Sequence, residues 1–297
     1  MPGNKGRNRP WIIIANVRAG SGGRAIRKIE AVLRRARVRF HCVVTRSVDE
    51  GAQLARSISG KAVVAAVLGG DGTMNNIGSH LAGGKAWLAA LPGGTENLLC
   101  RQLGLPSDPA DAAAQLLDAR PVRWDLGVLG ARPFLMIAGV GFDGAVCAET
   151  GGLAKSMFKQ AAYAMTAMRM LLRPAKVFSV RWEGKKMGRT VQACFSNGAY
   201  YGGGFKVAPK ADPADGVLDM TIFPYIGRLS RGMQMASAML LHREHLPHFS
   251  RHRILSALVG GRGLLQAQVD GEPFSVANPI VSIRPGALTL LSPQIKR

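Results

Sequence analysis

The acidic side chains that are candidates for chemistry stand in glycine- or proline-rich segments, where a turn can present a carboxylate to a ligand: Asp71, Asp212, Asp215, Asp270 and Glu272. The first stands in the segment GGDGT, which directly follows the apolar run Ala65–Leu68. Successive glycines let the main chain approach a bound group closely. A carboxylate at this point could orient a metal-bound phosphate or accept a proton, but the same residues also suit a tight turn. Both interpretations of Asp71 stay open at this stage.

The other four acids form two short segments. Asp212-Pro-Ala-Asp215-Gly offers carboxylate and carbonyl oxygens, which are the ligands of a hard cation, and it also has the composition of an Asp-Gly turn. Asp270-Gly271-Glu272 could supply a carboxylate for proton transfer, or it could be only the turn of a hairpin. The residues alone leave both segments with two interpretations.

The first 120 residues alternate between strand and helix patterns. Apolar runs predict strands, and the amphipathic segments between them predict helices. The predicted strands cover 11–17, 40–44, 61–68 and 87–91, and the predicted helices cover about 24–37, 49–58 and 74–81, with further helical segments to about 118. This order is typical of a parallel sheet with right-handed crossovers.

Such a sheet opens all its strand-to-helix loops on one edge, where ligands bind. The loops of this chain are 16–23, the residue Thr45, 69–73 and 92–97, and three of the four are rich in glycine. Backbone N–H groups and helix N-termini at such an edge favour negative charge. The loops therefore predict a phosphate cradle.

After Pro121 the pattern changes to short apolar runs that end in glycine, proline or aspartate. These runs predict a mostly antiparallel β-rich second domain. Two helical insertions are expected within it, near 152–173 and 228–243.

Composition narrows the class of partner. The chain has 297 residues and a net charge of +21, which points to an anionic partner. Aromatic residues make up only 6%, which disfavours binding of single-stranded nucleic acid by base stacking. The four cysteines are widely spaced and indicate reduced thiols in a cytoplasmic protein. Because no apolar run reaches about eighteen residues, no membrane-spanning helix is expected.

Other motifs are weaker. Gly20-x-Gly22-x-x-Ala25 partly fits a dinucleotide fingerprint, but the acid expected after the second strand is replaced by Thr45 and Arg46. An NADP-dependent oxidoreductase with Arg46 on the extra phosphate would leave GGDGT unexplained, and no Walker A motif is present. A group of histidines is interpreted as a solvated or interfacial set in preference to a metal site; these are His242, His245, His248 and His252.

Taken together, the segments resemble the diacylglycerol kinase catalytic-domain family, which also includes sphingosine and ceramide kinases. The matching segments occur in the order of that family: IIANVRAGSGG, LGGDGTMNNIGSHLAG, LPGGTENLLCRQLGLP, DLGVLG, FLMIAGVGFDGAV, FSNGAYYGGGFKVAPKADPADGVLDM and QVDGEPF. NAD kinases and phosphofructokinases share loops similar to GGDGT, so the later segments are the more specific ones.

The resemblance implies a fold and a set of domains. It implies a nucleotide-binding α/β domain over 1–122, of the kind found in NAD kinase and phosphofructokinase, to which residues 290–297 can also contribute. It implies an antiparallel β-sandwich lipid-substrate domain over 123–289, with the active site in the cleft between the two domains.

The resemblance also implies residue roles. Glu272 matches the proposed proton acceptor of the family, although some relatives give that role to the residue matching Asp71, which is otherwise expected to organise Mg-ATP. The structural Mg²⁺ site would be formed by Asp212, Asp215 and the carbonyl of Val217. The ATP contacts would be Asn16, Ala19, Gly20, Thr45, Gly70, Asp71, Gly72, Thr73, Asn75, Asn76, Gly94 and Thr95.

Three positions depart from the family pattern. Val17 replaces a proline, Asn76 replaces a common glutamate, and Leu98-Leu99 replace a frequent Asp-Phe pair. The second departure bears on metal handling or on the acceptor, and the third bears on substrate selectivity.

The implied activity is ATP-dependent transfer of the γ-phosphate to a lipid hydroxyl, with diacylglycerol as the acceptor. A sphingoid base, ceramide or phosphatidylglycerol are alternative acceptors. An NAD kinase-like soluble kinase and a basic nucleic-acid-binding protein are alternative functions. The implied partners are a lipid substrate and an anionic membrane surface rather than nucleic acid, with a homodimer as an option. The expected location is the cytoplasm, peripheral to the inner face of the membrane.

A helix over 152–173 is one candidate for membrane contact. At about 100° per residue, its basic side chains fall on one arc and its methionine-rich side chains on the opposite side. The alternative is a helix that buries its methionines in the second domain. The basic set is Lys155, Lys159, Arg169 and Arg173, and the apolar set is Met157, Ala161, Met165, Met168 and Leu172.

Overall fold

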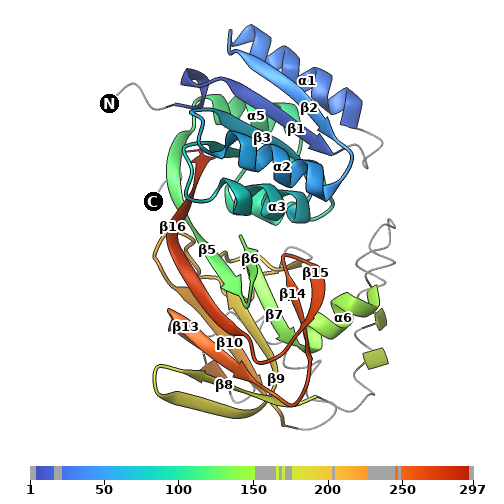
Figure 1. Cartoon of the computed structure of the whole chain (residues 1–297), viewed down its shortest axis with the longest axis vertical. Helices are drawn as coiled ribbons and strands as arrows, with labels where there is room; N and C mark the ends of the chain where they lie inside the picture. The colour runs from blue at the N-terminus through green and yellow to red at the C-terminus, as the bar shows by residue number, and fades with distance from the viewer. Residues whose placement is uncertain are drawn as a thin grey trace. The chain divides into compact units, whose positions relative to one another are not determined.

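The computed structural model describes residues 5–16, 22–150, 176–202, 205–226 and 249–293, together with the dipeptides 165–166, 169–170 and 245–246. The chain forms two compact units (Figure 1). The first unit contains Met1–Leu126 and Pro285–Arg297, and the second contains Gly127–Arg284. Two long strands, β5 (Arg120–Leu129) and β16 (Ile280–Ser292), each run from one unit into the other.

The first unit is built on a parallel sheet with the strand order β16-β4-β3-β1-β2. Its strands are β1 (Trp11–Asn16), β2 (Phe40–Thr45), β3 (Val64–Gly69), β4 (Trp87–Pro92) and the last part of β16, where Leu290 pairs with Leu88. Every residue of β3 and β4 is buried. Continuous burial is expected of parallel strands, because helices cover both faces of the sheet.

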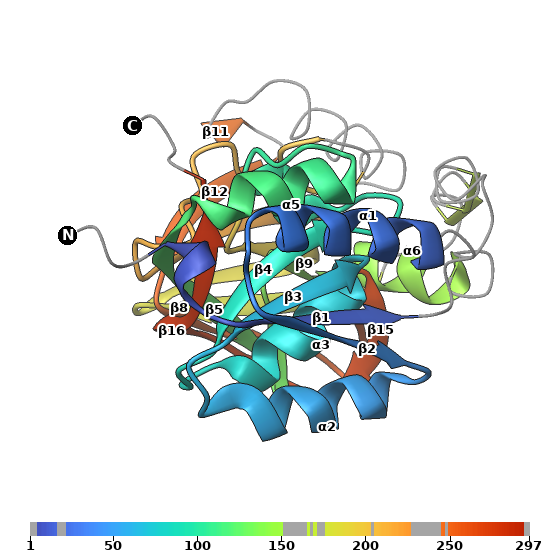
Figure 2. The same cartoon turned by 90° about the horizontal axis from the view of Figure 1, so that it is seen from above.

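Two helix pairs cover the two faces, as the view in Figure 2 shows. α1 (Gly22–Arg35) packs against α5 (Pro109–Leu117) on one face, and α2 (Val48–Ser59) packs against α3 (Asp71–Leu81) on the other. α4 (Leu98–Gln102) follows β4, and a short 3₁₀ helix covers Gly6–Asn8.

Side-chain caps fix two helix starts. Ser47 accepts the amide of Glu50 at 3.1 Å at the start of α2, and Asp108 accepts the amide of Ala110 at 2.8 Å at the start of α5.

The third loop of this sheet is shorter than the sequence predicts. The prediction starts the third helix near 74, whereas α3 begins at Asp71 with Gly70 as its N-cap. Asp71, Gly72 and Thr73 therefore form the first helical turn rather than a free loop. The physical reason is that Gly70 is extended, with φ −86° and ψ −178°, and is the only residue between the end of β3 and the start of α3.

The second unit is an antiparallel β-sandwich with a buried core that includes Phe134, Trp182, Phe195, Met220 and Val259. One sheet has the order β11-β12-β10-β9-β8-β13-β16, and β9 also pairs with β7, which pairs with β14 and through it with β15. The further strands are β6 (Arg132–Phe134), β7 (Ile137–Gly141), β8 (Phe178–Trp182), β9 (Lys185–Ser196), β10 (Leu218–Pro224), β11 (His245–Leu246), β12 (Phe249–Ile254), β13 (Ser256–Gly260), β14 (Leu265–Val269) and β15 (Glu272–Val276), and α6 covers Phe142–Thr150.

The predicted fold class, a parallel α/β domain followed by an antiparallel β-sandwich, is confirmed. The sequence patterns did not predict β11, β12, β13, β15 or α6. The predicted insertion at 228–243 lies outside the described residues, and only 165–166 and 169–170 of the 152–173 segment are described. Within the described part of the chain, no helix is long and apolar enough to cross a membrane.

Candidate active site

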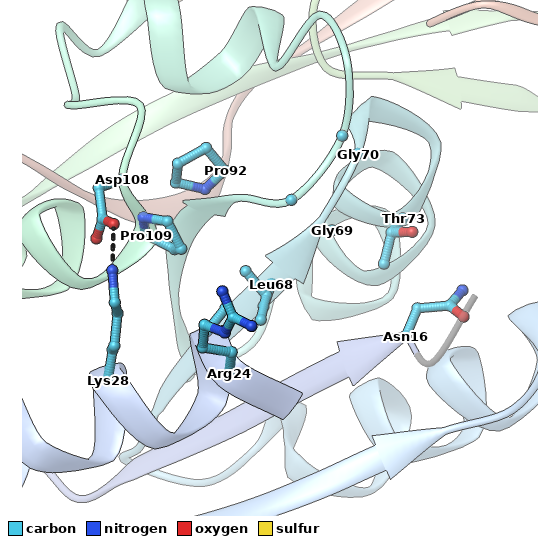
Figure 3. A pocket seen from close by; sticks show the side chains of 13 residues that line it. Asn16, Arg24, Lys28, Leu68, Gly69, Gly70, Thr73, Pro92, Asp108 and Pro109 are labelled. Atoms are coloured by element: carbon cyan, nitrogen blue, oxygen red, sulfur yellow. Dashed lines mark hydrogen bonds and ion pairs between the residues drawn. The ribbon is translucent and has the colours of Figure 1, made fainter. Parts of the chain in front are cut away.

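The carboxyl ends of β1, β3 and β4 open into a cavity of about 530 Å³ in the first unit (Figure 3). Four of the predicted nucleotide contacts line this cavity: Asn16 at the end of β1, Gly70 and Thr73 at the start of α3, and Gly94 after β4. The remaining lining consists of Arg24, Ala25, Lys28, Leu68, Gly69, Pro92, Gly93, Asp108 and Pro109.

Two glycine pairs meet at this cavity, backbone against backbone. The amide of Gly93 donates to the carbonyl of Gly69 at 3.1 Å. A Cβ atom on Gly93 would lie 2.8 Å from the amide nitrogen of Gly69, and one on Gly94 would lie 2.5 Å from the Cα of Gly70. Loop packing therefore excludes a side chain at both positions.

Gly70 is different from its neighbours. A Cβ atom there would meet only the Cα of Gly94, at 3.4 Å, which is ordinary van der Waals contact. Its φ of −86° is open to any residue. Neither packing nor backbone angle therefore requires glycine at this position.

The N-terminus of α3 adds a favourable environment for an anion. Its N-cap, Gly70, makes no side-chain hydrogen bond because it has no side chain. The positive end of the helix dipole and the amides of a first turn favour negative charge. The cavity therefore combines two closely packed glycine backbones with the N-terminus of a helix.

Asp71 also has a structural role. Its Oδ1 accepts the amide of Leu98 at 2.6 Å. Leu98 is the first residue of α4, whose N-cap Asn97 is left-handed, with φ 51°, and makes no side-chain capping bond. Asp71 therefore caps a second helix from 27 residues away. Burial chiefly, and the charge of Asp71 in addition, raise the pKa of the Cys100 thiol to about 12.

Thr45 and Asn76 make structural contacts and do not line the cavity. Thr45 is buried, and its Oγ1 donates to the carbonyl of Ala15 at 3.4 Å. The side-chain amide of Asn76 donates to the carbonyl of Val48 at 2.9 Å and ties α3 to α2. The other predicted contacts that lie outside the lining are Asp71, Gly72, Asn75 and Thr95. Ala19 and Gly20 lie outside the described residues.

Two cations on α1 also line the cavity, although the sequence reasoning missed them. Lys28 lies 3.1 Å from Asp108, whose other carboxylate oxygen caps α5, as Figure 3 shows. The hydrogen bond from Lys28 and the amide of Ala110 lower the pKa of Asp108. Arg24 stands one turn earlier and lines the same space. The sequence does contain a signal for these two cations, because they follow the glycine-rich loop 16–23 and stand four residues apart.

In the second unit, Glu272 follows a two-residue hairpin turn between β14 and β15. Both turn residues are left-handed, Asp270 with φ 45° and Gly271 with φ 85°, as an Asp-Gly turn of this type requires. The buried Asp270 carboxylate accepts three amides, from Leu135 at 2.7 Å, Met136 at 3.0 Å and Ile137 at 2.9 Å. The turn interpretation is thus correct for Asp270, and Glu272 begins β15 directly after it.

A buried polar network also holds this turn. Gln268 Oε1 accepts the amide of Gly271 at 2.8 Å, and Gln268 Nε2 donates to Asp143 at 2.9 Å. The hydroxyl of Tyr201 donates to the other oxygen of Asp143. The thiol of Cys147 donates to the carbonyl of Gly271 at 3.1 Å. Both backbone groups of Gly271 are therefore bonded, which fixes where Glu272 leaves the turn.

The Glu272 carboxyl has an unusual acidity. Although Glu272 stands at an exposed position of β15, partial desolvation raises its pKa above the ordinary value, and the charge of Arg132 lowers it. The guanidinium of Arg132 lies over the ring of Phe274, 4.5 Å from the ring centroid. A carboxylate with a raised pKa is a better proton acceptor at neutral pH.

The predicted metal segment forms a tight turn. Asp212 accepts the amide of Ala214 at 3.1 Å, and Asp215 accepts the amide of Val217 at 3.1 Å. The second oxygen of Asp215 lies 2.5 Å from the guanidinium of Arg253. The oxygen donors suit a hard cation, and Arg253 already supplies a positive charge at Asp215. Among the described residues, no group of three or more His, Cys, Asp or Glu side chains could hold a metal.

The described part of the histidine set contains His252, which packs on Trp182 with ring centroids 4.8 Å apart. His242 and His248 lie outside the described residues, as does the side chain of His245. All four cysteines are free.

Both halves of the chain match known protein families. A family model described as "Diacylglycerol kinase catalytic domain" matches residues 10–129. A second, described as "YegS C-terminal NAD kinase beta sandwich-like domain", matches residues 137–292.

Two curated relatives are both named "Probable lipid kinase YegS-like". The protein from Pseudomonas aeruginosa (strain UCBPP-PA14) is 34% identical over 242 residues, which is 76% of this chain and 75% of the relative. The protein from Chromohalobacter salexigens is 30% identical over 267 residues, which is 84% of this chain and 83% of the relative.

Two solved structures from Bacillus anthracis str. Sterne share the fold, with TM-scores of 0.80 and 0.73 at 22% and 20% identity. Each comparison covers 96% of this chain and 97% of the other, and the second structure is described as that of a diacylglycerol kinase. With two matched domains and curated relatives of at least 30% identity over most of its length, the chain belongs to the family of YegS-like lipid kinases.

Proposed function

We propose that this protein transfers the γ-phosphate of ATP to the hydroxyl of a lipid, and that diacylglycerol is the acceptor. The observation that carries the proposal is the cavity where Gly69-Gly70 meets Gly93-Gly94 at the N-terminus of α3. It is an anion-binding environment in which one glycine, Gly70, is free of any packing requirement.

Within this proposal the nucleotide phosphates lie along the glycine pairs. Their charge is met by the first turn of α3 and by the cations of α1, Arg24 and Lys28. Asp71 holds α4 in place through Leu98 and organises the nucleotide at the same time. Positioning and charge neutralisation supply most of the rate enhancement in phosphoryl transfer.

The reaction requires one proton acceptor. The hydroxyl oxygen of the lipid forms a bond to the γ-phosphorus, the bond between that phosphorus and the β–γ bridging oxygen breaks, and ADP leaves. Glu272 takes the hydroxyl proton, since its raised pKa suits general base catalysis. Such a base contributes roughly 10² to 10⁴-fold to the rate. Gln268 and Cys147 keep the preceding turn rigid.

Mg²⁺ belongs to this proposal as well. When bound with the nucleotide, it would neutralise phosphate charge. Asp212, Asp215 and the carbonyl of Val217 would hold a second, structural Mg²⁺, because their oxygens are the right donors. Arg253 would then have to give up its contact with Asp215.

The choice of acceptor rests on the names of the relatives, one of which is a diacylglycerol kinase. Sphingoid bases, ceramide and phosphatidylglycerol carry comparable hydroxyl groups and are the alternatives. A lipid acceptor also implies peripheral contact with a membrane.

The direct test supplies purified protein with γ-labelled ATP and a total lipid extract, and in parallel with NAD. Label in a chloroform-soluble product identifies a lipid kinase, and comparison with phosphatidic acid identifies diacylglycerol as the acceptor. Label transferred to NAD, with none in lipid, would refute the proposal.

A further inference from the structure

Half of the exposed large apolar side chains of the described chain come from one group of neighbouring strands in the second unit. Ten such residues are exposed, and five of them come from β8, β13, β16 and the loops next to these strands. They are Val177, Leu255, Leu258, Leu264 and Ile280. Scattered exposed apolar residues are normal, but a cluster marks an interaction surface.

The strand register places four exposed side chains in one row across the sheet. Lys186 on β9 is opposite Arg181 on β8, Arg181 is opposite Leu258 on β13, and Leu258 is opposite Ile280 on β16. Directly opposite residues share a face of the sheet. We call these four residues, Lys186, Arg181, Leu258 and Ile280, the basic–aliphatic row.

The opposite face of the same strands is the core of the sandwich. Val180, Val259 and Val281, each one position away from a residue of the row, are fully buried in it. Because side chains alternate along a strand, the basic–aliphatic row points away from the core. Leu258 is 38% exposed and Ile280 is 60% exposed.

The charge around the row is strongly one-sided. The segments 176–189, 255–264 and 276–284 carry one acid, Glu183. Against it they carry seven basic residues, which are Lys176, Arg181, Lys185, Lys186, Arg189, Arg262 and Arg284. A surface of this kind is complementary to an anionic partner.

We propose that the basic–aliphatic row is the surface through which the protein docks on an anionic lipid bilayer. Aliphatic side chains enter the boundary between headgroups and acyl chains, and Lys and Arg attract anionic headgroups. A second copy of the chain fits less well, because two such surfaces repel each other. Nucleic acid fits less well, because it offers nothing for the aliphatic side chains. The inference depends on the proposed function only for its choice of a lipid partner.

The test is co-sedimentation of the full chain, without nucleotide, with phosphatidylcholine vesicles that either contain or lack phosphatidylglycerol. The parent should bind only the anionic vesicles and be released by salt. Each cation close to the surface contributes about fivefold to partitioning. The double variant Arg181→Gln, Lys186→Gln should therefore bind about 25-fold more weakly, and Leu258→Ser with Ile280→Ser should also weaken binding.

Control variants distinguish binding through this surface from binding through positive charge elsewhere on the protein. Arg27→Gln with Arg35→Gln removes two exposed charges from α1 and should bind vesicles as the parent does. All variants alter exposed side chains, so their melting temperatures and their activity on detergent-dispersed lipid should match the parent.

Several results would overturn the inference. Parent binding that ignores salt and anionic lipid would do so, as would equal binding by the row and control variants. A protein that binds duplex DNA through these residues but not vesicles would make the partner a nucleic acid. A dimer that the row variants dissociate would make the surface an interface between copies. Vesicle binding through the row by a parent without kinase activity would refute the proposed function and leave this surface standing.

Discussion

Replacement of Gly70 separates a phosphate cradle from a loop that needs glycine only for packing. At Gly70 a new Cβ meets only the Cα of Gly94, at 3.4 Å. Loss of glycine at the N-cap of α3 costs about 0.5 kcal/mol in the free energy of unfolding, so Gly70→Ala should lower Tm by about 2 °C or less. Gly94→Ala instead drives its Cβ to 2.5 Å from backbone, and overpacking of this kind costs about 1–3 kcal/mol.

Substitution of Gly70 should have a large effect on ATP affinity even though its effect on Tm is small. If phosphates lie against the backbone at Gly70, the methyl group of alanine and the larger side chain of valine enter their space. An overlap of about 1–3 kcal/mol corresponds to roughly 5- to 150-fold weaker binding, with Gly70→Val worse than Gly70→Ala. Thermal unfolding and ATP titration of each variant measure the two effects separately.

A folded Gly70→Val variant that binds ATP as tightly as the parent would refute the cradle. The glycines would then be explained by the contact between the two loops alone. A large fall in Tm for Gly70→Ala would contradict the packing analysis, because the nearest atom would have to lie closer than 3.4 Å.

Four further substitutions test the roles of the acidic residues and of the contact between Asp215 and Arg253. Asp71→Asn keeps an oxygen for the amide of Leu98, so Tm should stay near that of the parent while turnover falls at least tenfold; unchanged turnover at an unchanged Tm would remove Asp71 from the chemistry. Glu272→Gln should keep ATP affinity, lower turnover and abolish the rise of turnover with pH. Because the pKa of Glu272 is raised in the folded state, ionisation of this carboxyl lowers the stability of the parent as pH increases from the unfolded-state pKa to the folded-state pKa. The Gln variant should therefore be slightly more stable than the parent at neutral pH, but not at a pH below both pKa values. Identical turnover of the two proteins across pH would make Glu272 structural. Asp215→Ala should lower both Tm and the stabilisation by Mg²⁺, and Arg253→Gln should strengthen that stabilisation; if Mg²⁺ shifts the Tm of neither the parent nor these variants, the turn holds an ion pair and no metal.

The first half of the fold was predictable because its signals are local. A buried parallel strand such as Val64–Gly69 is a continuous apolar run, and each run is followed by an amphipathic helix. The segment Phe249–Ile254 was missed because its sequence, FSRHRI, is half basic and lacks a visible alternation of apolar residues. It is paired on one side with β10, a strand that is distant from it in the sequence.

The cavity was predictable where glycine-rich loops follow the parallel strands, and the contacts that join residues distant in the sequence were not. Asn16, Gly70, Thr73 and Gly94 do line one cavity. The ion pair between Lys28 and Asp108 joins residues 80 positions apart, and no local pattern encodes it. The bond from Leu98 to Asp71 is of the same kind.

The segment predicted as an amphipathic membrane helix stays a prediction. Lys155, Lys159 and Arg173 lie outside the described residues. Arg169 is described, and its guanidinium lies 2.9 Å from the carboxylate of Glu149. Met165 is described as well, and it is 72% exposed rather than buried.

Phosphoryl transfer to a lipid hydroxyl can be measured in a single assay. Purified protein is incubated with γ-labelled ATP, Mg²⁺ and detergent-dispersed diacylglycerol, beside reactions that contain sphingosine, NAD or no acceptor, and Asp71→Asn is carried through as the inactive control. We expect label in phosphatidic acid for the parent and at least tenfold less for Asp71→Asn. Label in NADP, or no labelled product above the reaction without acceptor for any lipid, would show that the protein is not a lipid kinase.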